Sequence, residues 1–214
     1  MRTLAAVLLA AALPISLAEA QYVRFSVGPQ AGIAISAFAP DWKNFYGIGY
    51  GGGAHVDADI ARFFSARVNI EYFTFASDKE KLKQVLAPMF NVQASDISTL
   101  SGGNIGVVVV ELEALGKIPT RSIVTPYALF GLGIHSISLS DLSGSDKAGR
   151  SATVTSDDIH FNGGTNFGLD FGLGFEFRLN RGVALTAEFK YVLVFTQTNS
   201  NAAMPITVGA SFHL

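Results

Sequence analysis

The chain has 214 residues, of which 49% are hydrophobic and only 15% charged, and it contains no cysteine. The apolar content excludes intrinsic disorder, and the missing cysteine excludes disulfide scaffolds, thiol catalysis and a cysteine-linked lipid anchor. The net charge of −2 argues against a nucleic-acid partner, because phosphate contacts need a basic surface.

Residues 1–20 have the pattern of a secretory signal peptide. Arg2 gives a positive start, Leu4–Leu13 is apolar, and Ala18–Ala20 is a small-x-small cleavage signature. A membrane helix is the weaker interpretation, because the apolar run is shorter than about 18 residues. We therefore expect a signal peptide at 1–20 and a single further domain at 21–214.

The rest of the chain alternates apolar and polar residues with a period of two, which is typical of β-strands. In chain order the alternating segments are Phe25–Phe38, Tyr46–Ile60, Phe64–Phe75, Asn104–Leu115, Ile123–Leu139, Asn166–Leu179, Val183–Phe195 and Ile206–Leu214. The clearest is Asn166–Leu179, where the odd positions are all large and apolar and the even positions are all polar or glycine. These segments predict eight strands.

Such alternation fits a soluble barrel with an apolar interior or a membrane barrel with an apolar exterior. The lumen of an eight-stranded barrel is narrow, so the large residues of Asn166–Leu179 would overcrowd it, whereas the glycine-rich face fits. The polar face also lacks the abundant lysine and glutamate of a water-exposed surface. We therefore predict an all-β fold, an eight-stranded antiparallel up-and-down transmembrane β-barrel. A secreted lipocalin-like barrel is the weaker alternative.

The links between the strands alternate in length. If the first strand starts in the periplasm, the short links 61–63, 116–122 and 180–182 are periplasmic, and the long links 76–103 and 140–164 are external. This asymmetry is typical of outer-membrane barrels. We expect an integral protein of the bacterial outer membrane with periplasmic termini, in contact with lipids and lipopolysaccharide. The two long loops are the candidate surface for a partner.

The first long loop carries a helix signal. Ser77-Asp78-Lys79-Glu80 fits a capping box, and Pro88 is expected to end the helix. The apolar residues that follow the cap at helical spacing are Leu82, Val85, Leu86 and Met89. This stripe either packs against the barrel rim, which we favour, or forms a recognition element.

Aromatic residues gather in the first external link. They are Trp42, Phe45 and Tyr46. Aromatic side chains of membrane barrels concentrate at the two membrane–water interfaces. We therefore expect these three to belong to an interfacial girdle.

Three stretches of the chain follow a known pattern: Thr125–Gly133 (TPYALFGLG), the glycine-alternating hairpin Phe167–Tyr191, and the last strand. They resemble the outer-membrane β-barrel domain family, the eight-stranded OmpA/opacity-type barrels. The resemblance covers nearly the whole chain and implies architecture rather than activity. It also implies that the apolar row of the last strand is the signal read by the barrel-insertion machinery, although the family usually ends in Phe or Trp. The row is Ile206, Val208, Ala210, Phe212 and Leu214.

The sequence offers little catalytic chemistry, and we expect no catalytic residue, cofactor or metal site. The histidines His55, His135, His160 and His213 lie on different segments without ligand spacing. A lipopolysaccharide deacylase would need a Ser, a His and an acid together on the outer face. The nearest pair, His135-Ser136, should point to opposite faces of its strand. We predict a non-enzymatic scaffold or surface-interaction protein; a small porin-like channel for ions or solutes is the alternative.

Strand parity directs ten charged side chains into the lumen. They are Asp57, Arg67, Glu71, Glu111, Glu113, Asp170, Glu176, Arg178, Glu188 and Lys190. The turns place Asp57 opposite Arg67, and Lys190 opposite Gly172 and diagonal to Asp170. Charges in a narrow interior must pair or be neutralised, and the excess of acids should be protonated or hydrated. The sequence thus predicts a lumen plugged by ion pairs, whose leak would favour cations; a wet channel is the alternative.

Overall fold

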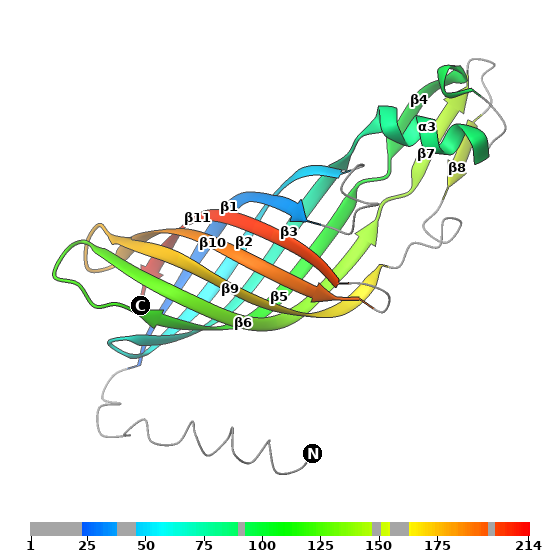
Figure 1. Ribbon diagram of the computed structural model, residues 1–214. Helices are drawn as coiled ribbons and strands as arrows, with labels where there is room; N and C mark the ends of the chain where they lie inside the picture. The colour runs from blue at the N-terminus through cyan, green and yellow to red at the C-terminus, as the bar shows by residue number, and fades with distance from the viewer. Residues whose placement is uncertain (1–22, 38–45, 90–92, 147–150, 155–162, 197–199) are drawn as a thin grey trace, which may run out of the picture.

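The computed structural model describes residues 23–37, 46–89, 93–146, 151–154, 163–196 and 200–214. Eight long antiparallel strands form a closed barrel (Figure 1). They are β1 (Arg24–Ala37), β2 (Tyr46–Ala61), β3 (Phe64–Ser77), β5 (Ile105–Lys117), β6 (Val124–Leu139), β9 (Gly164–Arg178), β10 (Val183–Phe195) and β11 (Ser200–His213). The predicted fold and all eight strands are confirmed, and only β11 starts well before its predicted first residue. The predicted signal peptide, residues 1–20, lies outside the described residues.

The barrel closes where the first strand meets the last. Strands β1 and β11 pair antiparallel, with Ile33 opposite Ile206, so that neither keeps an open edge. The short connections 62–63, 118–123 and 179–182 lie at the end that carries the C-terminus, which we call the turn end (Figure 1). The opposite end is the loop end. Among the helices of the described residues, none is long and apolar enough to cross a bilayer.

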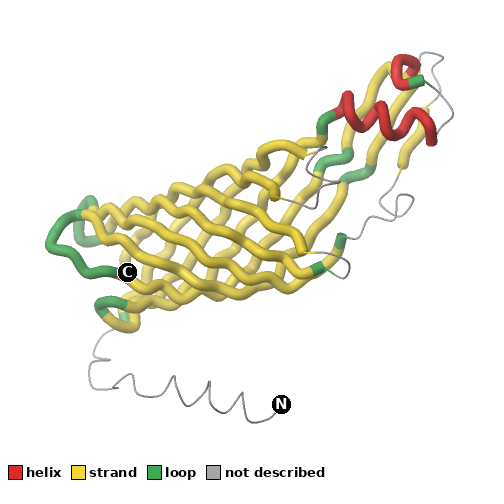
Figure 2. Tube along the Cα trace, viewed as in Figure 1, coloured by secondary structure: helices red, strands yellow, loops and turns green. Residues whose placement is uncertain are grey.

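The two long loops fold together beyond the loop end. Strand β4 (Ile97–Gly102) comes from the first, and β7 (Leu142–Asp146) and β8 (Ser151–Val154) come from the second. They form a sheet of order β4-β7-β8, flanked by α3 (Lys79–Met89) and the short η2 (Ala94–Asp96). Figure 2 shows these five elements projecting from the barrel, and we call them the loop module. Its strands are too short to show a clear alternation, so the sequence predicts loops there.

Helix α3 confirms the predicted helix but corrects its cap. Ser77 still belongs to β3, and the carboxylate of Asp78 accepts the Lys81 backbone N–H at 3.3 Å. This hydrogen bond lowers the pKa of the Asp78 carboxyl. The helix also continues through Pro88 to Met89, because a proline in the last turn removes only one backbone hydrogen bond. The side chains of Val85, Leu86 and Met89, expected in the apolar stripe, lie outside the described residues.

The two faces of the barrel wall differ as the alternation predicts. On β9, Phe171 and Leu173 are 49% and 63% exposed, whereas Asp170 is 0% exposed. Exposed large apolar side chains recur on all eight strands, and the buried polar residues share the opposite face. The apolar face therefore points outward and the polar face lines the lumen.

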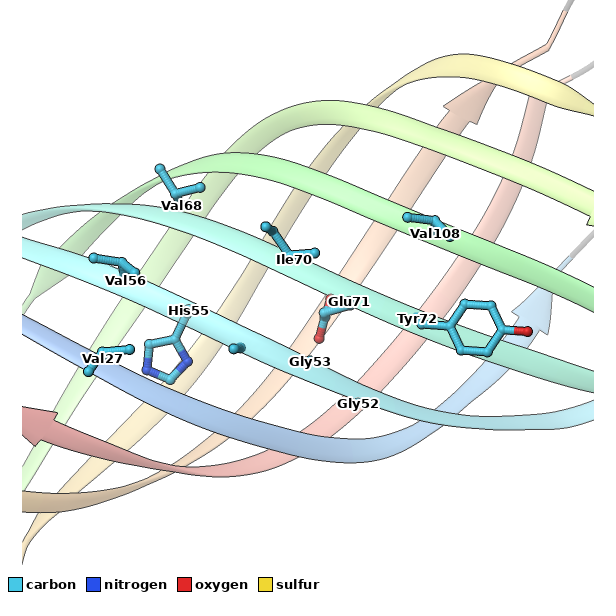
Figure 3. Close-up of a pocket in the computed structure, with 11 residues that line it drawn as sticks. Val27, Gly52, Gly53, His55, Val56, Val68, Ile70, Glu71, Tyr72 and Val108 are labelled. Atoms are coloured by element: carbon cyan, nitrogen blue, oxygen red, sulfur yellow. The ribbon is translucent and has the colours of Figure 1, made fainter.

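The outer wall is hollowed at the glycine run of β2. Gly52 and Gly53 lie among the exposed side chains of Val56, Val68 and Ile70 in a shallow depression of about 480 Å³ (Figure 3). A Cβ at Gly53 would lie 1.9 Å from the carbonyl oxygen of Ile70. Glycine at 53 therefore lets β2 and β3 approach closely on the inward face, and Gly52, which shares the outward face with Val56, leaves the depression on the outer face without a side chain.

Candidate functional site

The lumen collects most of the charged residues that the sequence directs there. Eight of the ten are at most 4% exposed: Asp57, Arg67, Glu71, Glu111, Glu113, Asp170, Glu188 and Lys190. Glu176 and Arg178 instead lie near the turn end, where Arg178 is exposed and donates to the Thr125 hydroxyl at 3.1 Å. Lys117 was not among the predicted residues; its ammonium donates to Asp59 at 2.8 Å and to Glu176 at 3.3 Å.

One group of charges surrounds Arg67, and we call it the Arg67 cluster. Asp57 lies opposite Arg67 in the β2–β3 register, as predicted, and accepts its Nε at 2.6 Å and its Nη2 at 3.2 Å. Nη1 reaches across the lumen to Glu188 on β10, which also accepts the Tyr127 hydroxyl. The planar guanidinium thus ties β2, β3 and β10 together.

A second group, the Lys190 cluster, lies farther toward the loop end. The Lys190 ammonium donates to Glu111 at 2.7 Å and to Glu71 and Glu113 at 3.0 Å each. Lys190 lies opposite Gly172, as predicted, but Asp170 is not among its hydrogen-bonding partners. The long side chain crosses the lumen to β3 and β5 instead of reaching along its own hairpin.

Two neutral amides complete the Lys190 cluster. Gln30 Nε2 donates to Asn69 Oδ1 at 2.8 Å and to Glu71 Oε1 at 2.7 Å, and Asn69 Nδ2 donates to Glu111 Oε2 at 3.3 Å. Both residues are on the polar faces of their predicted strands. They were not predicted because neither carries a charge, but every polar residue at an inward position of a predicted strand is a candidate for the lumen.

Part of the Lys190 cluster has the layout of a cation site. Glu111, Glu113 and Asp170 each offer a carboxylate oxygen, and these oxygens lie within 4.8 Å of one another. The three side chains come from β5 and β9 and are buried. Only the histidines were expected as possible ligands from the sequence. Strands β5 and β9 both flank β6, where Gly131 pairs with Glu113 on one side and with Asp170 on the other, and this brings the carboxylates together.

An apolar layer fills the lumen at the loop end. Its buried members are Ala34, Tyr46, Phe73, Phe75, Ile105, Val107, Val109, Ile137, Val192 and Val194. The girdle expectation for Tyr46 is therefore wrong: its ring is buried in this layer, 7% exposed, and its hydroxyl donates to the Gly103 carbonyl at 3.1 Å. Trp42 and Phe45, the other two expected girdle aromatics, lie outside the described residues.

Comparison with known proteins settles the family. The model of the family described as "Outer membrane protein beta-barrel domain" matches residues 3–213. The chain belongs to this family. It is an integral outer-membrane barrel, and its outward apolar face is the face in contact with lipid.

Solved structures of other outer-membrane proteins share the fold. The Neisserial surface protein A is 14% identical with a TM-score of 0.54, over 88% of this chain and 96% of that chain. A major outer membrane protein from Thermus thermophilus is 15% identical with a TM-score of 0.55, over 91% of this chain and 100% of that one. No curated protein matches the chain. At these identities the likeness concerns the fold of the outer-membrane barrel alone.

Two histidine–serine pairs in the described part of this outer-membrane barrel do not have the arrangement of a hydrolase triad. His135 is buried in the lumen while Ser136 is half-buried on the opposite face of β6, as strand parity predicts. The structure adds one pair: His55 Nε2 lies 2.9 Å from the Ser211 hydroxyl. The nearest carboxylate, Asp57, approaches the same nitrogen at 3.9 Å, whereas a triad needs the acid on the other nitrogen. His160 lies outside the described residues, and His213 is half-buried.

Proposed function

We propose that this outer-membrane barrel is a non-enzymatic scaffold that carries the loop module at the cell surface, where the module binds a partner. The observation that supports this most directly is the filled lumen. Two charged clusters and an apolar layer follow one another along the axis, so a solute would have to displace both ion pairs and hydrophobic packing. A barrel whose interior is filled in this way serves better as a rigid support than as a conduit.

The loop module is anchored to the barrel rim by polar contacts. The Lys79 ammonium donates to the Ser77 hydroxyl at 2.7 Å and to the Gly102 carbonyl, and Gly103 N–H donates to the Ser140 carbonyl at 3.2 Å. The Asn104 backbone N–H donates to the Ser140 hydroxyl at 2.9 Å. These contacts hold the base of the module in a fixed position. A module that is already ordered loses less conformational entropy when a partner binds, which favours recognition.

The surface of the module's sheet is rich in hydroxyl groups. The Ser98 hydroxyl donates to the Ser145 carbonyl at 2.9 Å, the Thr99 and Ser145 hydroxyls are 2.6 Å apart, and Ser101 donates to the Ser143 carbonyl at 3.4 Å. These interactions are exposed. Hydroxyl groups donate and accept hydrogen bonds, so this face suits a polar partner.

The proposal includes an orientation and an assembly route. The loop end would face the exterior and both termini the periplasm, because longer loops are external in this architecture. The last strand presents an apolar row to lipid, with Val208 63% and Phe212 46% exposed. We propose that the row Ile206, Val208, Ala210, Phe212 and Leu214 is read by the barrel-insertion machinery during assembly.

Two measurements test the proposal. In planar bilayers, the refolded protein should show no stable openings; stable single-channel openings would favour the porin-like alternative instead. Because the chain has no cysteine, single cysteines report the orientation cleanly. On intact cells, an impermeant maleimide should label Ser143→Cys in the loop module and spare Ser122→Cys at the turn end. The reverse labelling would overturn the orientation.

A further inference from the structure

We propose that the lumen binds one hard divalent cation, of the class of Ca²⁺, Mg²⁺ and Mn²⁺, between Glu111, Glu113 and Asp170. Around the Lys190 ammonium lie four carboxylates, those of Glu71, Glu111, Glu113 and Asp170, all at most 2% exposed. One ammonium does not neutralise four buried carboxylates, so this layer of the lumen is rich in uncompensated negative charge.

The carboxylate oxygens show where the missing positive charge belongs. Lys190 binds one oxygen of Glu111 and one of Glu113. The other oxygen of each, and both oxygens of Asp170, are buried and have no hydrogen-bond partner among the described residues. The nearest cationic group to the second oxygen of Glu113 is Arg67 Nη1, at 3.5 Å. A buried carboxylate without donors is strongly destabilising unless a cation or proton joins it.

The spacing of these oxygens suits a single ion. Oxygens from Glu111, Glu113 and Asp170 lie within 4.8 Å of one another. Calcium–oxygen distances are about 2.3–2.6 Å, so two oxygens on opposite sides of one ion lie about 5 Å apart. An all-carboxylate donor set selects hard cations over soft ones.

A buried histidine beside the carboxylates is the second, independent observation. His135 is 2% exposed, its Nε2 has no hydrogen-bond partner among the described residues, and this atom lies 3.7 Å from Glu111 Oε1. A small cavity of about 40 Å³ lies within the apolar layer, and Glu71, Glu111 and His135 line its side toward the Lys190 cluster.

The neighbouring backbone makes room for this arrangement. Gly131 on β6 pairs with Asp170 on β9, and a Cβ at Gly131 would lie 2.4 Å from Asp170 Oδ1. On the other side, a Cβ at Gly168 would lie 2.3 Å from His135 Nε2. Both glycines lie on inward positions, so the Asp170 carboxylate and the His135 ring occupy space that side chains would otherwise fill.

Retention of Mn²⁺ by the full-length barrel tests the site. The protein is refolded into lipid nanodiscs with Mn²⁺ present, because the closed lumen slows entry afterwards, and loosely bound ions are removed on a chelating resin. Electron paramagnetic resonance after acid release then counts the metal. Wild type should retain one Mn²⁺ per barrel, and Asp170→Asn should retain at least tenfold less. Glu176→Gln, at the turn end, is the matched control and should retain as much as wild type.

Two results would overturn the proposal. The first is that the wild-type protein retains no Mn²⁺ and its thermal stability rises as the pH falls. This would show that protons alone neutralise the carboxylates of the cluster. The other is Asp170→Asn that retains as much Mn²⁺ as wild type. Asn has nearly the shape of Asp, so folding should persist, and circular dichroism checks it. If Asp170→Asn does not fold, Glu111→Gln is measured in its place. Independently of either variant, Mn²⁺ should raise the unfolding temperature of the wild-type protein.

Discussion

The Arg67 and Lys190 clusters occupy the same lumen and arise from the same strand alternation, yet their carboxylates are compensated to different degrees. Arg67 donates to Asp57 through two nitrogens and to Glu188 through a third. Tyr127 adds a further donor to Glu188. Lys190 has a single nitrogen for Glu71, Glu111 and Glu113, and the neighbouring Asp170 has no donor to its carboxylate among the described residues.

The difference follows from the chemistry of the two cations. A guanidinium is planar and presents five donors in a fixed fork, which matches carboxylates in pairs, whereas an ammonium is a point charge with three donors. In the Arg67 cluster, protein donors therefore satisfy most of the carboxylate oxygens of Asp57 and Glu188. The Lys190 cluster has more acids than its cation can serve, and so it is the layer where an additional ion or proton is expected.

The largest effect is expected when both cations are removed. Arg67→Ala with Lys190→Ala leaves six buried carboxylates without a cationic partner in the two clusters, so the barrel should become less stable and any openings should favour cations. Conductance should rise only modestly, because the apolar layer around Phe75 still narrows the loop end. Planar-bilayer recordings on protein shown to be folded by its heat-modifiable migration provide the measurement. Unchanged conductance together with unchanged stability would mean that these ion pairs neither close the lumen nor hold the barrel.

Single replacements then separate the clusters. Removing one partner of a buried ion pair lowers the free energy of unfolding by roughly 3–5 kcal/mol. Lys190→Met should lie at the upper end of that range, because it leaves four carboxylates together. Arg67→Met should lie at the lower end, since it leaves chiefly Asp57 and Glu188. Urea titrations in lipid vesicles with a chelator measure both, and equal losses would show that the local excess of acids is unimportant.

Replacing an aspartate by asparagine should change the free energy of unfolding in opposite directions in the two clusters. Asp57→Asn should be destabilising by roughly 1.5–3 kcal/mol, because hydrogen bonds to charged groups contribute that much. In metal-free buffer, Asp170→Asn should instead raise the free energy of unfolding, by ~1 kcal/mol, because it removes an unpaired buried charge. The same urea titrations compare them. Destabilisation of similar size in both variants would contradict the contrast between the clusters.

Much of this architecture could be predicted from the sequence, because a period of two determines which face of a strand each residue occupies. The strands, the outward position of Phe171 and the pairing of Asp57 with Arg67 depend only on parity and short turns. Contacts between strands that do not follow one another depend on barrel closure, so the reach of Lys190 to β3 and β5 could not be foreseen. The loop module was missed for a related reason: its sheet joins short segments of two loops far apart in sequence.

The smallest effect is expected at an exposed pair in the loop module, which gives the baseline for the buried clusters. In α3, Lys83 Nζ lies 3.0 Å from Glu80 Oε1, and the Glu80 side chain is 79% exposed. Exposed ion pairs of this kind contribute about 0.3–0.5 kcal/mol and are screened by salt. Glu80→Gln also removes a favourable charge near the helix N-terminus. Together these losses should lower the local stability of α3 by less than about 1 kcal/mol. Hydrogen exchange of the α3 amides at low and high ionic strength measures it. Both buried clusters should respond far more strongly and depend little on ionic strength, because their charged residues are at most 4% exposed and salt screens buried charges less than exposed ones. If Glu80→Gln lowered stability as much as Lys190→Met does, burial would not be the reason that the lumen charges matter for stability.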